Sequence, residues 1–135
     1  MGEPMRRLIL VAAMLAIAGV ARAGDIYIYD LLKDPAHAHA WKVARGSAKG
    51  VPAWLRDDDN GYIAEPAKTV AIEDKTYSIS VLAKQHATNE GQAAVMFNAD
   101  ASRAWAEIQQ EGKPELYLGK PSAAQKGALD NALAQ

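Results

Sequence analysis

Strict alternation of apolar and polar side chains over residues 76–82 is the feature that most limits the possible folds. The segment reads TYSISVL, which places Tyr77, Ile79 and Val81 on one side of an extended chain and small hydroxyl side chains on the other. This pattern is typical of a strand with one buried face. Residues 68–72 are predicted to form another strand, and only the short polar stretch 73–75 separates the two. The pair is therefore predicted to form a β-hairpin.

Further short segments continue this pattern toward the C-terminus. Residues 92–97 and 115–118 are predicted to be strands. In the segment 102–110 the alanine content favours a helix and the alternation favours a strand, and we predict a strand because the neighbouring segments are strands. Helices are predicted at both ends. One begins at Asp34-Pro35 and runs to about residue 49, and the other begins at the capping-box pattern Ser122–Gln125. Sequential strands with short connections predict an antiparallel sheet in a single α+β domain.

The first 23 residues have the features of a secretory signal peptide. Arg6 and Arg7 precede an apolar run over residues 8–20, which is shorter than the roughly 20 residues that a membrane-spanning helix requires. The run ends at Ala21-Arg22-Ala23, whose small residues predict cleavage before Gly24. We therefore expect a periplasmic protein with a signal peptide over residues 1–23, one domain over residues 24–135, and no membrane insertion after cleavage.

Charge and cysteine content exclude several classes of protein. Because the leader holds three arginines and one glutamate, the rest of the chain carries 12 basic and 15 acidic residues, a net charge of −3. This balance offers no basic surface for nucleic acid and slightly favours a basic partner. The chain has no cysteine, which excludes disulfides, thiolate metal sites and a cysteine nucleophile. Packing alone must then stabilise the fold in an oxidising compartment.

No spacing of residues predicts an enzyme, a cofactor site or a metal site. His37 and His39 would lie about 200° apart on a helix, so they could not ligate one ion. The acidic turn 57–61 lacks the glycine and glutamate that an EF-hand loop requires. Composition alone leaves a triad of Ser80, His86 and a carboxylate open, but no nucleophile-elbow or phosphate-loop spacing is present. We therefore predict a protein that is not an enzyme and has no cofactor.

His86 lies in the middle of a polar loop, residues 83–91, between the two most regular strands. A loop carried by a rigid sheet is well suited to present one side chain to a partner. The alternative is an exposed histidine without a function, and spacing alone does not separate the two.

Four segments between residues 51 and 131 resemble the inhibitor of vertebrate lysozyme (Ivy) family: VPAWL, TYSISVL, AKQHATNEG and AAVMF. The family's loop, Cys-Lys-Pro-His-Asp-Cys, aligns without a gap with residues 83–88, so that the lysine and the histidine are retained. The resemblance implies a curved antiparallel sheet of about five strands with helices packed on one side. It also implies a periplasmic inhibitor that blocks a c-type lysozyme or a related muramidase, and dimers occur in the family. The residues implied to contact lysozyme are those of the loop: Lys84, Gln85, His86 and Ala87.

The loop departs from the family's pattern at four positions. Ala83 and Thr88 replace the two cysteines, Gln85 replaces the proline and Ala87 replaces the aspartate. A disulfide-closed loop is pre-organised, and ordering an open one costs about 1–2 kcal/mol for each backbone residue fixed. Two functions therefore stay open. One is lysozyme inhibition, and the other is that of a non-inhibitory envelope protein that binds or controls an endogenous peptidoglycan-lytic enzyme.

Overall fold

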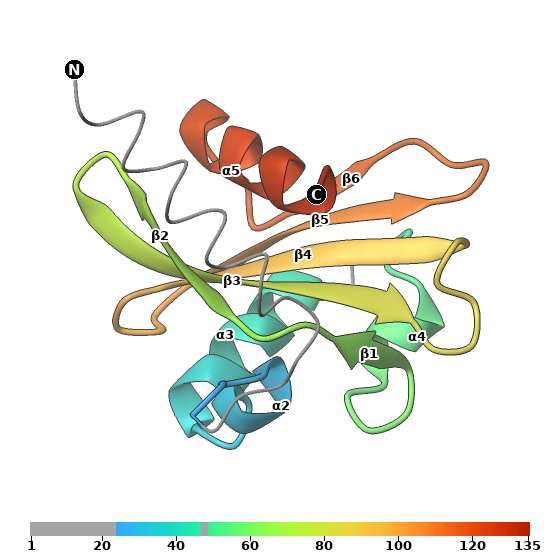
Figure 1. The fold of residues 1–135 in the computed structure, drawn as a ribbon, viewed down its shortest axis with the longest axis horizontal. Helices are drawn as coiled ribbons and strands as arrows, with labels where there is room; N and C mark the ends of the chain where they lie inside the picture. The colour runs from blue at the N-terminus through green and yellow to red at the C-terminus, as the bar shows by residue number, and fades with distance from the viewer. Residues whose placement is uncertain (1–23, 47–48) are drawn as a thin grey trace.

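A computed structural model describes residues 24–46 and 49–135, and the predicted signal peptide lies outside them (Figure 1). The elements in chain order are α2 (Ile28–Leu31), α3 (Pro35–Arg45), α4 (Ala53–Arg56), β1 (Tyr62–Ala64), β2 (Lys68–Ile72), β3 (Lys75–Lys84), β4 (Gly91–Asn98), β5 (Ala104–Gln110), β6 (Leu116–Leu118) and α5 (Ala123–Leu133). In the described part of the chain, no helix is both long enough and apolar enough to cross a membrane.

The strands form one open antiparallel sheet of six strands in the order β1-β3-β4-β5-β6, with β2 also paired to β3. The first half of β3 pairs with β2 and its last residues pair with β1, so this ten-residue strand holds both neighbours on the same edge. The strands predicted at 68–72, 76–82, 92–97 and 115–118 are confirmed within two residues at each end. The segment 102–110 is a strand, as its alternation predicted.

Helices cover both faces of the sheet. On one face, helices α2, α3 and α4 contribute the fully buried side chains of Ile28, Trp41 and Leu55 to a core with β3, β4 and β5. On the other face, Leu129 of α5 packs against a second core cluster from the same sheet, which consists of Tyr77, Ile79, Ala94, Met96 and Trp105. Figure 1 shows α5 and α3 on opposite sides of β4.

The single α+β domain is therefore confirmed, whereas the expectation that the helices pack on one side is wrong. The reason lies in β4, which is buried at six of its eight positions. Because successive side chains of a strand point to opposite faces, a strand buried along its length presents apolar surface on both faces. Each face then needs its own helical cover.

Both long helices begin at the predicted residues. The Asp34 side chain accepts a hydrogen bond from the backbone nitrogen of His37 (3.3 Å), and Pro35 occupies the first helical position. Ser122 and Gln125 form the reciprocal capping box at the start of α5. Helix α3 ends at Arg45 rather than near residue 49, because Gly46 follows it with a φ of +47°, which favours glycine.

Candidate functional site

His86 is exposed on the connection between β3 and β4, as the hairpin pattern predicted. The two strands pair in register from Tyr77↔Asn98 to Ala83↔Gln92, and β3 runs on to Lys84. The projecting loop is therefore residues 85–90, shorter than the predicted 83–91. Strand β1 pairs alongside, with Tyr62 opposite Lys84, so the loop stands at the corner where β1, β3 and β4 meet.

Backbone hydrogen bonds order this loop without a covalent cross-link. The Ala87 nitrogen donates to the Lys84 carbonyl (3.2 Å) and the Glu90 nitrogen donates to the Ala87 carbonyl (2.9 Å), which makes two successive turns. Within the first turn, His86 has a φ of +65°, in the left-handed region that residues other than glycine rarely adopt. Such a conformation persists only where the surrounding structure fixes it. The two turns thus hold the histidine backbone in one conformation.

An ion pair closes the base of the loop. The Lys84 Nζ lies 3.2 Å from Glu90 Oε1, and 38% of the lysine side chain and 59% of the glutamate side chain are exposed. Lys84, which the resemblance implies to contact the target, also bridges the end of β3 and the residue before β4. Because the pair is exposed to solvent, it contributes at most about 1 kcal/mol to stability.

Trp54 of α4 packs beneath the same corner and allows only glycine beside it. A β-carbon at position 91 would lie 2.7 Å from Cζ2 of the Trp54 indole. A β-carbon at position 61 would overlap the Trp54 carbonyl oxygen and lie 2.7 Å from the Asp57 carbonyl oxygen. Gly61 in turn accepts a hydrogen bond from the Gln85 nitrogen at 3.1 Å. Helix α4, the turn 57–61 and the loop therefore form one packed unit.

Sequence reasoning missed these supporting residues. The sequence pattern places Gly61 in a turn and Trp54 in the apolar stretch VPAWL, and it does not distinguish Glu90 from the other polar residues of the loop. A glycine that opens a strand, as Gly91 does, is a sign of a close approach by another group, and it could have indicated the tryptophan. The partners themselves come from distant parts of the chain and follow no spacing.

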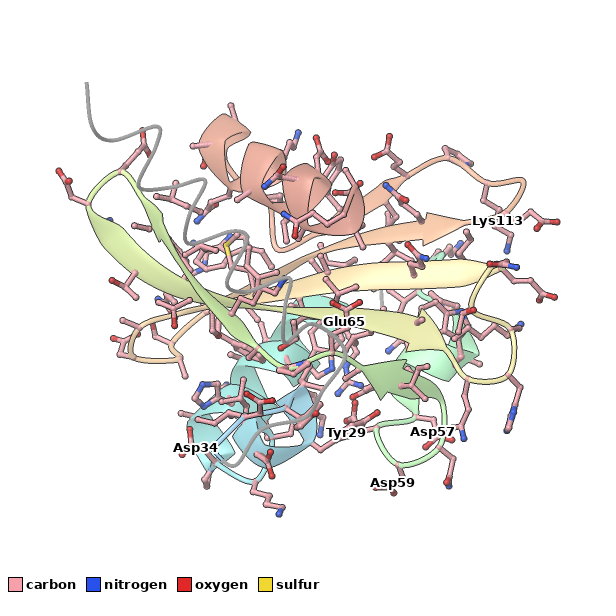
Figure 2. All side chains as sticks on the ribbon, viewed as in Figure 1. Tyr29, Asp34, Asp57, Asp59, Glu65 and Lys113 are labelled. Atoms are coloured by element: carbon pink, nitrogen blue, oxygen red, sulfur yellow. The ribbon has the colours of Figure 1, made fainter. Side chains whose placement is uncertain are left out.

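Exposed charged side chains of both signs lie near the loop. Asp57 and Asp59 lie on the turn beside β1, where Figure 2 labels them. Glu90 and Glu111 are exposed next to the loop, and the Glu111 nitrogen donates to the Glu90 carbonyl at 3.0 Å. Lys84 pairs with Glu90, and Lys113, which Figure 2 also labels, is exposed two residues after Glu111. The surface is therefore mixed in charge, and only the net charge of −3 over residues 24–135 slightly favours a basic partner.

The other candidate groups considered in the sequence do not form a catalytic or metal site among the described residues. Ser80 is fully buried within β3, whereas His86 is exposed on the loop, so the two do not form a triad. His37 and His39 lie on helix α3, and Nδ1 of His37 is 2.6 Å from Asp34 Oδ2, so His37 is engaged by the helix cap. In the acidic turn, Asp57 accepts hydrogen bonds from the backbone nitrogens of Asp59 and Asn60, as in an ordinary capped turn.

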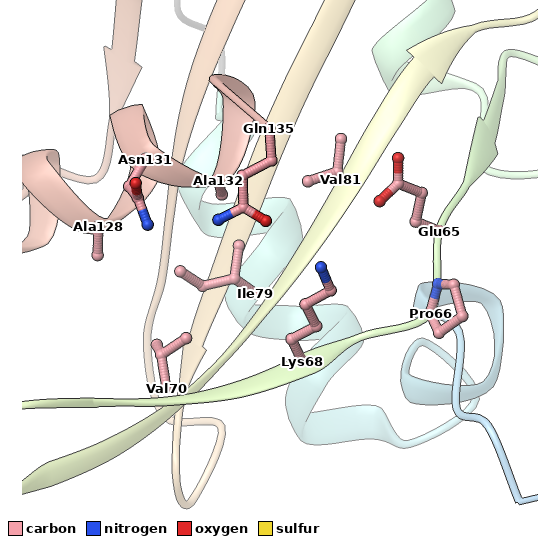
Figure 3. A pocket seen from close by; sticks show the side chains of 10 residues that line it. All are labelled: Glu65, Pro66, Lys68, Val70, Ile79, Val81, Ala128, Asn131, Ala132 and Gln135. Carbon is pink, nitrogen blue, oxygen red and sulfur yellow. The ribbon is translucent and has the colours of Figure 1, made fainter. Parts of the chain in front are cut away.

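A small cavity lies on the face of the sheet that α5 covers, between the end of α5 and strands β2 and β3 (Figure 3). Apolar side chains of Val70, Ile79 and Ala132 line it, with Lys68 and Glu65 at its edge. Its volume is about 70 Å³. Pockets for small organic ligands have volumes of about 300–1,000 Å³. The cavity is therefore too small for a substrate.

A family model described as inhibitor of vertebrate lysozyme (Ivy) matches residues 36–135, from α3 to the C-terminus, and this range includes the loop and its supports. The chain belongs to the Ivy family. Ivy proteins are lysozyme inhibitors rather than enzymes, and lysozyme is the partner of the family. A comparison with curated proteins gives no match.

The loop of this chain is held without a disulfide, because the chain has no cysteine. The positions that the resemblance aligns with cysteines are Ala83, the last β3 residue paired with β4, and Thr88, an exposed residue of the second turn. The Lys84–Glu90 ion pair and the packing of Trp54 against Gly91 lie at the same place in the fold. The loop base is therefore closed by non-covalent contacts.

Proposed function

We propose that this Ivy protein is a periplasmic inhibitor that inserts His86 into the active-site cleft of a c-type lysozyme or a related muramidase. The observation that carries the proposal is the exposed His86, held in a left-handed conformation at the tip of a hydrogen-bonded loop. A side chain on a fixed backbone loses little conformational freedom on binding. Gln85 and Ala87 flank it and would complete the contact surface.

The chemistry of the target fits an imidazole. Lysozyme cleaves its substrate with two carboxyl groups, one as acid and one as nucleophile. A protonated imidazole donates hydrogen bonds from both ring nitrogens, so His86 can engage both carboxyl groups at once.

The net charge of the chain supports a basic target. Residues 24–135 carry a net charge of −3, and Asp57, Asp59 and Glu111 are among the exposed acidic residues. Complementary charges mainly raise the association rate, and salt screens the effect. Export by the predicted signal peptide would place the inhibitor in the envelope, where it would meet lysozyme.

The loop sequence also favours a second candidate function. Gln85 and Ala87 replace the proline and aspartate of the family's loop, and both cysteines are absent. A target whose cleft differs from that of a c-type lysozyme would explain these changes. In this candidate the protein is a non-inhibitory envelope protein that binds or controls an endogenous peptidoglycan-lytic enzyme.

Titration of enzyme activity with the purified mature protein separates the two candidates. A basic c-type lysozyme and a bacterial lytic muramidase would be assayed in parallel on the same peptidoglycan substrate. Saturable inhibition of the c-type enzyme supports the proposal. If neither enzyme is inhibited at about 100 µM, the inhibitory function is wrong, and binding of the bacterial enzyme without inhibition would favour the second candidate.

Replacing Lys84 with alanine is expected to weaken inhibition much less than replacing His86. The substitution removes an exposed ion pair with Glu90, so the free energy of unfolding should fall by less than about 1 kcal/mol. Glu90→Gln is the matched variant, because it breaks the same ion pair and keeps the lysine. If the ion pair matters through loop order, both variants should weaken inhibition equally. If only Lys84→Ala weakens it, the lysine contacts the target directly.

A further inference from the structure

Three carboxylates converge on the face of the sheet that α5 covers. Glu107 belongs to β5, Glu115 precedes β6 and Asp130 belongs to α5. One oxygen atom from each lies within 4.8 Å of the others. The register of the sheet explains the meeting, because Glu107 pairs with Tyr117, and Glu115 and Tyr117 share one face of their strand. Like charges at this separation repel one another unless something neutralises them.

Glu107 supplies an independent observation. Its side chain is fully buried, and its Oε1 atom accepts no hydrogen bond from an N–H or hydroxyl group; the polar neighbours of Glu107 on this side are the carboxyl groups of Glu115 and Asp130. An unsatisfied buried carboxylate oxygen is costly, so it requires either a proton or a cation. No lysine or arginine among the described residues forms an ion pair with any of the three carboxylates. The nearest lysine, Lys126, places its Nζ over the Tyr117 ring, 5.1 Å from the ring centre.

Neighbouring side chains fix the carboxylates and leave other oxygen atoms unengaged. The Tyr117 hydroxyl donates to Asp130 Oδ1 at 2.6 Å, and Gln109 Nε2 donates to Glu107 Oε2 at 3.1 Å. Partners of this kind orient the ligands in metal sites. Glu115 and Asp130 are exposed, so an ion can reach the cluster from solvent.

The geometry points to a binding site for a hard divalent cation at Glu107, Glu115 and Asp130. The donors are all oxygen atoms, which suit calcium, magnesium and manganese and not the softer metals. Calcium fits best because it accepts irregular coordination and completes its shell with water, whereas magnesium requires near-octahedral geometry. With three carboxylates, a dissociation constant of about 10⁻⁴–10⁻³ M is expected, in the range of extracellular calcium modules.

Isothermal titration of the mature protein with calcium chloride at about pH 8 tests the proposal. One saturable site is expected in the wild type, and Glu107→Gln should weaken it more than tenfold. Glu111→Gln is the matched control, because it removes an exposed carboxylate outside the cluster. Asp130→Asn gives a second test at an exposed position if Glu107→Gln disturbs the fold. The absence of saturable binding by the wild type up to about 10 mM calcium would overturn the proposal. It would show that a proton shared among the three carboxyl groups, and not a cation, reduces their repulsion. Equal binding by Glu107→Gln would overturn the proposal as well.

Discussion

Replacing Gly61 with alanine is expected to lower the free energy of unfolding by about 3 kcal/mol or more. The new β-carbon would overlap the Trp54 carbonyl oxygen and lie 2.7 Å from the Asp57 carbonyl oxygen. Both obstacles are backbone atoms, so no side chain can rotate away to make room. Relief requires α4 and the turn 57–61 to move, which strains the hydrogen bond from the Gly61 nitrogen to the Asp57 carbonyl (2.9 Å).

Urea unfolding of Gly61→Ala beside Gly127→Ala measures this effect. A β-carbon at Gly127 meets nothing within 4 Å inside helix α5, so alanine there should stabilise the domain by up to about 1 kcal/mol. The two variants make the same chemical change with opposite expected signs. Equal midpoints for Gly61→Ala and the wild type would show that Gly61 does not pack against the backbone of α4 and of the turn 57–61 as described.

The alternation of residues 76–82 and the apolar run of residues 92–97 predicted the hairpin that carries His86, because a strand with one buried face leaves a clear period of two and a short apolar run is typical of a buried strand. The helix starts at Asp34 and Ser122 were also predicted, since capping depends only on neighbouring residues. These features are local in sequence. The position of His86 at a loop tip follows from them.

Features that depend on distant contacts were not predicted. Strand β1 has three residues and helices α2 and α4 have four each, which is too short for a periodic pattern. The cover of both sheet faces follows from the burial of β4, which a run of small and apolar residues does not reveal by itself. The carboxylates of Glu107, Glu115 and Asp130 come from three separate parts of the chain, so no sequence motif predicts that they lie together.

Replacing His86 with alanine is expected to weaken lysozyme inhibition by about 2–5 kcal/mol, or roughly 30- to 5,000-fold. The variant leaves the target's two carboxyl groups enclosed by the inhibitor without the imidazole that would bond to them. The loss should appear mainly in the dissociation rate, since a buried charged contact rather than long-range attraction is removed. The domain's stability should change by no more than about 0.5 kcal/mol, because His86 is exposed.

His39→Ala is the matched control for this substitution. His39 is also exposed and has the same side chain, but it lies on helix α3 beside Arg103 and Ala104, at the end of the sheet opposite the loop. Any general effect of losing an imidazole, such as a change in net charge at low pH, would appear in both variants. Unfolding curves for the two proteins would show that differences in inhibition come from the contact itself.

The inhibition constants of wild type, His86→Ala and His39→Ala against a basic c-type lysozyme at about pH 6 test the His86 mechanism most directly. The wild type and His39→Ala are expected to inhibit with the same constant, and His86→Ala at least about 30-fold more weakly. Equal inhibition by the wild type and His86→Ala would contradict insertion of this side chain into the cleft.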